Sequence, residues 1–149
     1  MQQPDVAHAV WHGTWTLDQL HAITRGTLVE HLGIEFCAIG EDFLRARLPV
    51  RQHTAQRLGF LHGGASLALV ETVGSIASQM CVAPEFVSLG LEINANHVRT
   101  VRQGQVVEAT ARPVHLGQQT QIWSVRVESE EGKLVCIARL TTSIQPRKS

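Results

Sequence analysis

Hydrophobic and polar positions alternate in two parts of the chain, and this pattern predicts strands. From Leu44 to Leu48, apolar side chains occupy one face and two arginines the other, as in a half-buried strand. A partner strand is expected before the turn at 40–42. After Pro84, apolar side chains fall at the odd positions from Val87 to Ala95. Turn residues then separate three further expected strands, over 105–114, 120–129 and 134–144.

Residues 63–81, between these strand regions, are almost wholly apolar or small and lack a run of β-branched residues. This composition predicts a long helix that is buried on nearly every side. Nearer the N-terminus, capping boxes that begin at Thr16 and Thr27 predict a pair of short helices over 17–32. The expected fold is therefore α+β, with one antiparallel sheet of about six strands wrapped around one long central helix.

Length and charge narrow the possible functions. The chain has 149 residues, enough for one domain, which we place at 16–149 after a loosely held tail at 1–15. Trp11 and Trp15 of this tail are expected to dock on apolar surface. Thirteen Lys and Arg residues balance thirteen Asp and Glu residues. This balance argues against nucleic acid and anionic membranes as partners.

Targeting and redox features favour the cytoplasm. No apolar run approaches the roughly 20 residues that cross a bilayer, and the first residues lack the pattern of a signal peptide. The three cysteines, Cys37, Cys81 and Cys136, lie far apart without a CxxC spacing. An odd number of separated cysteines suits free thiols in a reducing compartment.

Glu71 is the first candidate for chemistry, because it is the only Asp, Glu, Lys or Arg between Leu58 and Pro84. A carboxylate in such a segment is expected to be paired, protonated or functional. Ser75 lies on the same helix face and can share a substrate or a water with it. Two alternatives stay open: Glu71 reaches solvent or caps a neighbouring strand, and Ser75 bonds to the carbonyl four residues earlier.

His62, Gly63 and Gly64 mark the expected start of the same helix. The two glycines leave the first N–H groups accessible, and a helix start favours negative charge, including a developing oxyanion. Alternatively, the glycines only permit tight packing of the helix on the sheet. His97 continues the odd positions of the strand after Pro84, so it is expected near the glutamate if that face packs on the helix. A structural histidine is the alternative.

Other chemistries lack their motifs. His62, His97 and His115 offer no HxH or HxxxH spacing for a metal. The sequence has no P-loop, no GxGxxG and no G-x-S-x-G. We therefore expect neither a metal nor another cofactor.

The motif Gly59 to Ser66, with Glu71 and Gly74-Ser75, resembles hotdog-fold acyl-CoA thioesterases of the 4-hydroxybenzoyl-CoA type that carry a helix glutamate. The resemblance runs from about Trp15 to Ile144, while residues 51–55 match only loosely. It includes the segments 91–99, 113–117 and 139–142. It implies a hotdog fold, in agreement with the predicted elements, and hydrolysis of acyl-CoA thioesters, with aromatic acyl groups favoured. Carrier-protein thioesters are a second substrate class.

The resemblance also implies roles for individual residues. Glu71 would attack the thioester carbonyl to give a mixed anhydride, or act as a base towards water. Gly63 would donate its N–H to the carbonyl oxygen. Gln56 and His62 would orient the thioester and its thiolate, and Ser75 would position the water. The CoA groove would involve Gly90, His97, Val98, Arg99, Thr100, Val114, His115, Leu116, Gly117, Gln118, Gln119 and Ser143.

The expected site cannot be completed within one chain. Gly63 and Glu71 are eight residues apart, which is about 12 Å along a helix. A glutamate cannot lean back that far, so the carboxylate is expected from a second subunit whose central helix runs antiparallel. The resemblance implies the same homodimer and suggests a dimer of dimers. Two other functions stay open: a hotdog dehydratase, which pairs its helix carboxylate with a histidine, and a module that binds acyl-CoA without turnover.

Overall fold

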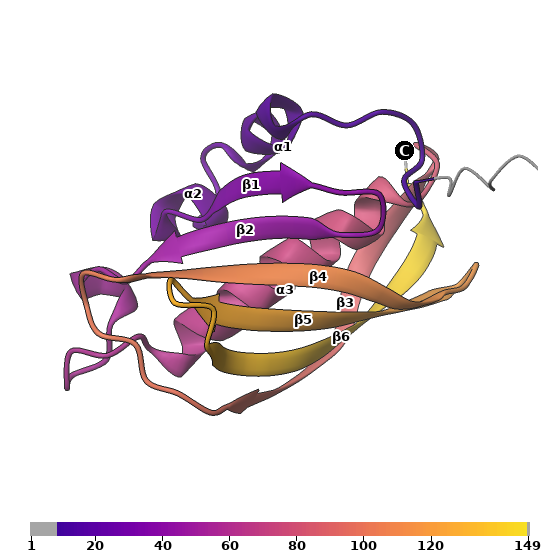
Figure 1. Cartoon of the computed structure of the whole chain (residues 1–149). Helices are drawn as coiled ribbons and strands as arrows, with labels where there is room; N and C mark the ends of the chain where they lie inside the picture. The colour runs from indigo at the N-terminus through magenta and orange to yellow at the C-terminus, as the bar shows by residue number, and fades with distance from the viewer. Residues whose placement is uncertain (1–8, 149) are drawn as a thin grey trace, which may run out of the picture.

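Six antiparallel strands form one sheet, and one long helix lies against it (Figure 1). This computed structural model describes residues 9–148. The strand order across the sheet is β1-β2-β4-β5-β6-β3. In chain order the elements are α1 (Leu17–Thr24), α2 (Leu28–Leu32), β1 (Glu35–Ile39), β2 (Leu44–Pro49), a 3₁₀ turn (Gln52–Thr54), α3 (Gly63–Met80), β3 (Phe86–His97), β4 (Val106–Leu116), β5 (Thr120–Ser129) and β6 (Leu134–Pro146).

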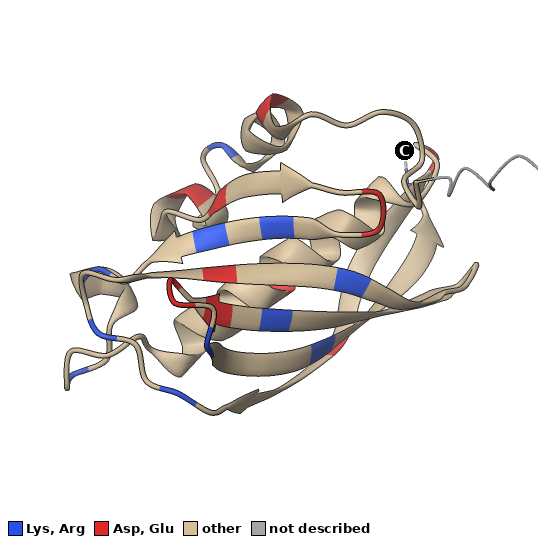
Figure 2. Ribbon diagram, viewed as in Figure 1, with Lys and Arg blue, Asp and Glu red and all other residues tan. Residues whose placement is uncertain are grey.

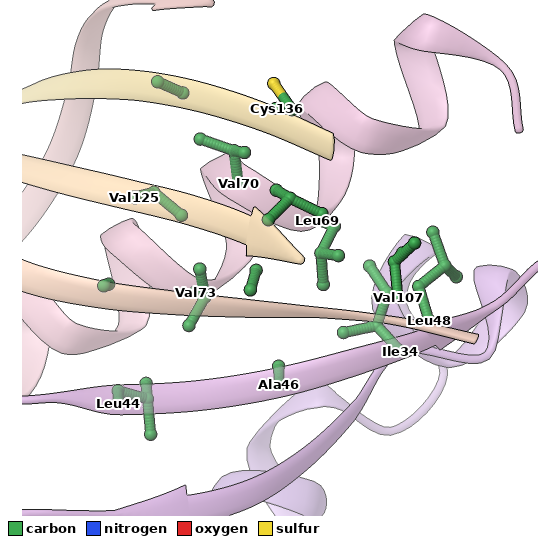
Figure 3. Packing of buried hydrophobic residues seen from close by; sticks show 14 of the residues in the cluster. Ile34, Leu44, Ala46, Leu48, Leu69, Val70, Val73, Val107, Val125 and Cys136 are labelled. Atoms are coloured by element: carbon green, nitrogen blue, oxygen red, sulfur yellow. The ribbon is translucent and has the colours of Figure 1, made fainter. Parts of the chain in front are cut away.

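The predicted fold class is confirmed, and the core lies between the sheet and one face of α3 (Figure 3). Leu69, Val70 and Val73 of α3 are fully buried, as are Leu44 and Leu48 of β2. Burial of a side chain of this size contributes about 1.5–3 kcal/mol. The alternating positions of β2 therefore face the helix, as the sequence pattern predicted.

The two short helices begin where their capping residues predicted. The N–H of Gln19 donates to Oγ1 of Thr16 (3.2 Å), and its own Oε1 accepts from the N–H of Thr16 (2.9 Å), which completes the first capping box. The second predicted box is wrong in one detail. Thr27 caps α2, but the carboxylate of Glu30 accepts from the N–H of Gly26 (2.7 Å), because the left-handed turn at Gly26 brings that group to it.

The N-terminal segment is held more firmly than the sequence predicted. Trp11 stacks on the buried Trp123, with ring centroids 6.2 Å apart and planes inclined by 4°. Its Nε1 donates to the carbonyl of Gly40 (2.7 Å), so the indole gains apolar contact and a hydrogen bond together. Trp15 is half-buried against the core, as expected. Residues 1–8 of the predicted tail lie outside the described residues.

The prediction that α3 is buried on nearly every side is wrong for the single chain. Its sheet-facing side is buried, from Ala65 to Met80. The other side is only half-buried and includes Leu67, Ala68, Glu71, Thr72, Ser75 and Ile76. One sheet can cover only one side of a helix, so no layer formed by residues 9–148 lies over this second face of α3.

Strand β3 does not keep the single alternation that its sequence suggested. A β-bulge interrupts its pairing with β6 between Gly90 and Glu92, and the extra residue is Leu91. The bulge reverses which positions face the helix. Leu89 and Leu91 are therefore 51% and 61% exposed, whereas Ile93, beyond the bulge, packs against the core.

No helix within residues 9–148 is both long and apolar enough to cross a membrane.

Candidate active site

Glu71 lies halfway along α3, on the half-buried face, and its carboxylate reaches strand β3. Its Oε1 accepts a hydrogen bond from Oγ of Ser75 (3.0 Å). Gly90 of β3 is so close that a Cβ atom at this position would overlap Oε1. No salt bridge among residues 9–148 involves Glu71. The carboxylate is thus oriented by the neutral Ser75 hydroxyl and not by a cation.

The start of α3 presents a free backbone donor. His62 is the N-cap residue, and its Nδ1 accepts from the N–H of Gly64 (2.8 Å). The neutral imidazole therefore carries its proton on Nε2. The N–H of Gly63 has no acceptor among the described residues. It stands at the positive end of an eighteen-residue helix, which suits it to bind an oxyanion.

A cavity of about 450 Å³ opens at this helix start, and we call it the helix-start cavity. Oε1 of Gln56 accepts from the N–H of Leu58 inside a tight turn, so the amide is held in place beside the cavity. The cavity is lined by Gln56, Phe60, Leu61, Gly63, Ser66, His97, Val98, Arg99, Thr100 and Val135. The structure thus brings Gln56, Gly63 and the stretch 97–100 together.

His97 lies at the helix start and not beside the glutamate. A Cβ atom on Gly63 would be 3.2 Å from Nε2 of His97. The expectation that this imidazole shares the region of Glu71 is wrong, because β3 meets α3 at two separate places. Gly90 faces the middle of the helix, and His97 faces its first turn.

A second and larger cavity, of about 780 Å³, lies at the other end of α3, and we call it the helix-end cavity. Its lining includes the predicted residues Leu116, Gly117, Gln118 and Gln119. Cys81, which ends the helix, also lines it, and burial raises the pKa of this thiol to about 12. Val114 and His115 lie next to it on β4, where a bulge interrupts the pairing with β5. Ser143 of β6 lines neither cavity.

The predicted site residues therefore form three groups along one helix. Gly63, with its free N–H, and the helix-start cavity are at the first turn, Glu71 with Ser75 and Gly90 is in the middle, and residues 116–119 are at the end. The two cavities share no lining residue. One chain alone does not bring the carboxylate to the Gly63 donor.

Several residues of these cavities were not anticipated from the sequence. Phe60, Leu61, Ser66 and Val135 line the helix-start cavity. At the far end, Oγ of the buried Ser78 donates to Oε1 of Gln121 (2.7 Å), and Gln121 lines the helix-end cavity. The sequence did contain a signal for Gln121. It lies on the same face of its strand as Trp123 and Val125, so a polar residue stands where the alternation predicts a core residue.

The described residues, 9–148, contain no group of three or more His, Cys, Asp or Glu side chains that could hold a metal ion. The groups distributed along α3 are a carboxylate, a hydroxyl, an amide, imidazoles and a free backbone N–H. These groups can add a nucleophile to a carbonyl and stabilise the resulting oxyanion.

Comparison with known proteins connects this geometry to one family. The thioesterase superfamily profile matches residues 58–136. The chain is 45% identical to 1,4-dihydroxy-2-naphthoyl-CoA hydrolase of Escherichia coli, over 91% of this chain and 98% of that enzyme. It is also 45% identical, with 91% and 98% coverage, to the proofreading thioesterase EntH of Cronobacter turicensis.

Solved structures agree with the sequence relatives. The crystal structure of a thioesterase from Haemophilus influenzae has a TM-score of 0.89 at 45% identity, and the match covers 92% of this chain and 95% of that one. A mutant thioesterase from Pseudomonas aeruginosa has a TM-score of 0.90 at 43% identity, with 93% and 99% covered. The chain therefore belongs to the thioesterase superfamily and is a thioesterase of the hotdog fold.

Proposed function

We propose that the protein hydrolyses acyl-CoA thioesters, preferentially those of aromatic acids, with Glu71 as the catalytic carboxylate. One observation carries this proposal. Glu71, the only Asp, Glu, Lys or Arg between Leu58 and Pro84, is aimed at β3 by Ser75 and fits there because position 90 is a glycine. A structural carboxylate at a solvated helix edge needs neither the oriented hydroxyl nor the missing Cβ.

The proposed chemistry is acyl transfer to water. The thioester carbonyl oxygen accepts the N–H of Gly63, which stabilises the oxyanion that develops. Glu71 either attacks the carbonyl carbon, so that the C–S bond breaks and a mixed anhydride forms, or removes a proton from a water that attacks instead. In the first route water then cleaves the anhydride. Both routes release the free acid and the thiol of CoA.

Neighbouring side chains orient the reactants in this mechanism. Gln56 and the Nε2–H of His62 lie beside the same helix start and serve as donors to the thioester and the departing thiolate. Ser75 positions the hydrolytic water next to the carboxylate to which it is bonded. The groove for the pantetheine arm and nucleotide comprises the stretch 97–100, with Gly90, residues 114–119 and Ser143.

The active site in this proposal is shared between two subunits. Gly63 and Glu71 are separated by about 12 Å along α3, so the donor of one chain must meet the carboxylate of another. The half-buried face of α3 supplies a surface for a second, antiparallel α3. Strand β3 is an edge strand with exposed Leu89 and Leu91, and such an edge favours pairing with a second copy. Two dimers form a tetramer in the proposed assembly.

The relatives support the choice of substrate class. One is named for an aromatic CoA thioester, the dihydroxynaphthoyl one, and the other for proofreading. Carrier-protein thioesters are the second class that we propose. We place the activity in the cytoplasm, since Cys37, Cys81 and Cys136 are all free, as suits a reducing compartment.

A thiol-trapping assay tests the proposal directly. Purified protein is incubated with benzoyl-CoA, a short aliphatic acyl-CoA and a long-chain acyl-CoA, and released CoA is measured with a chromogenic disulfide. We expect the highest kcat/KM with the aromatic ester. Absence of thiol release from all three would overturn the proposed function, and a preference for the aliphatic esters would overturn the aromatic assignment.

A further inference from the structure

The helix-end cavity is uncharged and mostly apolar. None of the described residues that line it is Asp, Glu, Lys or Arg, and the tip of the β4–β5 hairpin beside it carries no blue or red band in Figure 2. The thiol of Cys81 adds no charge, because burial raises its pKa to about 12. The apolar part of the lining comprises Val10, Val82, Ala83, Phe86, Leu116, Ile144 and Pro146. With about 780 Å³, the cavity has the size of sites that hold small organic molecules.

Gln121 is the buried polar side chain of this lining, and its amide has one fixed orientation. The residue is only 3% exposed. One end of the amide accepts from Nε1 of Trp123 (3.2 Å) and from Oγ of Ser78 (2.7 Å). An indole N–H can only donate, so this end must be the oxygen, Oε1, and the opposite end is the NH₂ group.

A network of buried hydroxyl groups holds the oxygen end in place. Oγ of Ser78 accepts from Oγ of Ser88 (2.7 Å) and lies 2.8 Å from Oγ1 of Thr142. Ser78 and Thr142 have no exposed surface. Rotation of the Gln121 amide would leave the Trp123 and Ser78 donors without an acceptor in a buried place, which is costly.

The NH₂ group of Gln121 is left available to the cavity. Nε2 has no acceptor among residues 9–148, although every fully buried side-chain nitrogen and oxygen in this range has a partner. Nε2 is therefore not fully buried. Because Gln121 is otherwise enclosed and lines the helix-end cavity, this cavity is the route by which another molecule reaches its two N–H donors.

We infer that the helix-end cavity binds an uncharged cyclic compound whose carbonyl oxygen accepts a hydrogen bond from Nε2 of Gln121. A carbonyl oxygen offers lone pairs to the donors and brings no proton that needs an acceptor of its own. A carboxylate would fit poorly, since it would lose water without gaining a cation among the described lining residues. The apolar walls suit the ring of the ligand.

This site is separate from the proposed active site, and the inference does not depend on the proposed function. Cys81 follows Glu71 by ten residues, which is about 15 Å along a helix axis. Neither Glu71 nor Gly63 lines the helix-end cavity. Residues 116–119 belong both to its lining and to the proposed CoA groove, so CoA must be included as a competitor in any test.

Heteronuclear NMR titration of the full-length protein tests the inference. The probes are tetralone, tetralin and tetralin carboxylate, which share one bicyclic skeleton and carry a carbonyl group, no polar group and a negative charge, respectively. The signals are the side-chain NH₂ of Gln121 and the methyl groups of Ile144, which also lines the cavity. The proteins are the wild type, Gln121→Met and the matched control Gln118→Met, since Gln118 lines the same cavity but is exposed.

We expect tetralone to shift the Gln121 NH₂ protons downfield and tetralin to shift only the Ile144 methyl signals. Wild-type affinity should be about 5-fold to 10-fold higher for tetralone than for tetralin, and lowest for the carboxylate. Gln121→Met should bind tetralone and tetralin equally, whereas Gln118→Met should keep the preference. Saturating CoA should leave the tetralone-induced shift of Gln121 in place.

Three results would overturn the inference. The first is a Gln121 NH₂ signal that does not respond to tetralone, and this wild-type measurement decides even where Gln121→Met does not fold. The second is a preference for tetralone that persists in Gln121→Met. The third is loss of the tetralone-induced shift on addition of CoA, which would make the cavity a part of the CoA groove.

Discussion

Gly90 of β3 and Glu71 of α3 are in direct contact: the carboxylate oxygen Oε1 occupies the space that a Cβ atom at position 90 would fill. The contact occurs immediately before the bulge at Leu91, where the strand changes the face that it presents to the helix. Oγ of Ser75 donates a hydrogen bond to the same oxygen (3.0 Å). The position of the carboxylate is therefore set by one missing side chain and one hydroxyl.

Gly90→Ala should displace the Glu71 carboxylate and reduce kcat about 10-fold to 100-fold, since small misplacements of a reacting group carry costs of this order. The fold should persist, because the displaced atoms are the end of a flexible side chain. Steady-state kinetics with an aromatic acyl-CoA and thermal unfolding measure both effects.

A double-mutant comparison of positions 71 and 90 provides the control. Glu71→Asp shortens the side chain and removes it from the overlap, so Gly90→Ala should cause little further loss in the Glu71→Asp background. A Gly90→Ala loss of the same size in both backgrounds would show that the glycine acts on something other than this carboxylate.

Glu71→Gln should lower kcat by at least about 10³-fold, because it removes the nucleophile or base while keeping the shape of the side chain. The amide oxygen can still accept from Ser75, so the unfolding temperature should change little. Glu41→Gln is the matched control, since Glu41 is an exposed glutamate in the turn between β1 and β2. Near-normal turnover in Glu71→Gln would contradict the proposed mechanism.

Cys81 should make stability depend on pH in alkaline solution. Burial raises the pKa of its thiol from 9.0 to about 12, so the folded state keeps a proton that the unfolded state loses. Its contribution is complete below about pH 9 and is lost as pH rises towards 12. Between pH 8.5 and 10.5, the free energy of unfolding should fall by about 1 kcal/mol more in the wild type than in Cys81→Ala, after allowance for partial exposure.

Denaturant titrations at several pH values measure this difference. Cys37 and Cys136, whose thiol pKa values are also raised by burial, are present in both proteins and cancel in the comparison. Parallel pH profiles for the two proteins would show that Cys81 is not protected from ionisation in the folded state.

Local sequence patterns predicted the elements of this fold well, because each element agrees with its own periodicity and capping residues. The alternation of Leu44 to Leu48 corresponds to a strand with one buried face, and the apolar segment from Gly63 corresponds to α3. The isolated Glu71 could be identified as a candidate site residue because charged residues are rare in such an apolar segment. These patterns depend on residues close together in the sequence, and the elements that they predicted are present in the structure.

The wrong predictions concern features that depend on tertiary structure and not on local sequence. One extra residue at Leu91 reverses the faces of β3, and an alternation pattern cannot show where two residues of a strand lie opposite one residue of its partner. His97 was also expected near Glu71, whereas it faces Gly63, because Gly90 and His97 meet α3 at different points along its length. The sequence also predicted more burial of α3 than the single chain provides. An apolar helix face predicts burial, but it does not show whether the same chain or a second chain covers that face.

The separation of the free Gly63 N–H from the Glu71 carboxylate leads to the last prediction. Each shared site uses Gly63 of one chain and Glu71 of the other. A two-fold axis relates the two chains, so a dimer contains two such sites. Damage to the carboxylate and damage to the donor side then fall in the same site of a mixed dimer when they are carried by different chains, and the other site stays intact. This distribution can be tested by mixing two inactive variants.

Glu71→Ala chains are refolded together with chains that carry Gln56→Ala and His62→Ala. In a mixed dimer, one site combines the intact Glu71 of the second chain with the intact Gln56, His62 and Gly63 of the first. Half of randomly formed dimers are mixed and each has one intact site, so the mixture should regain about a quarter of wild-type activity. Each variant refolded alone is the control, and native mass spectrometry of chains of different length verifies exchange. Mixtures that contain mixed dimers yet stay inactive would exclude a shared site, because nothing else in the design prevents the two halves from meeting.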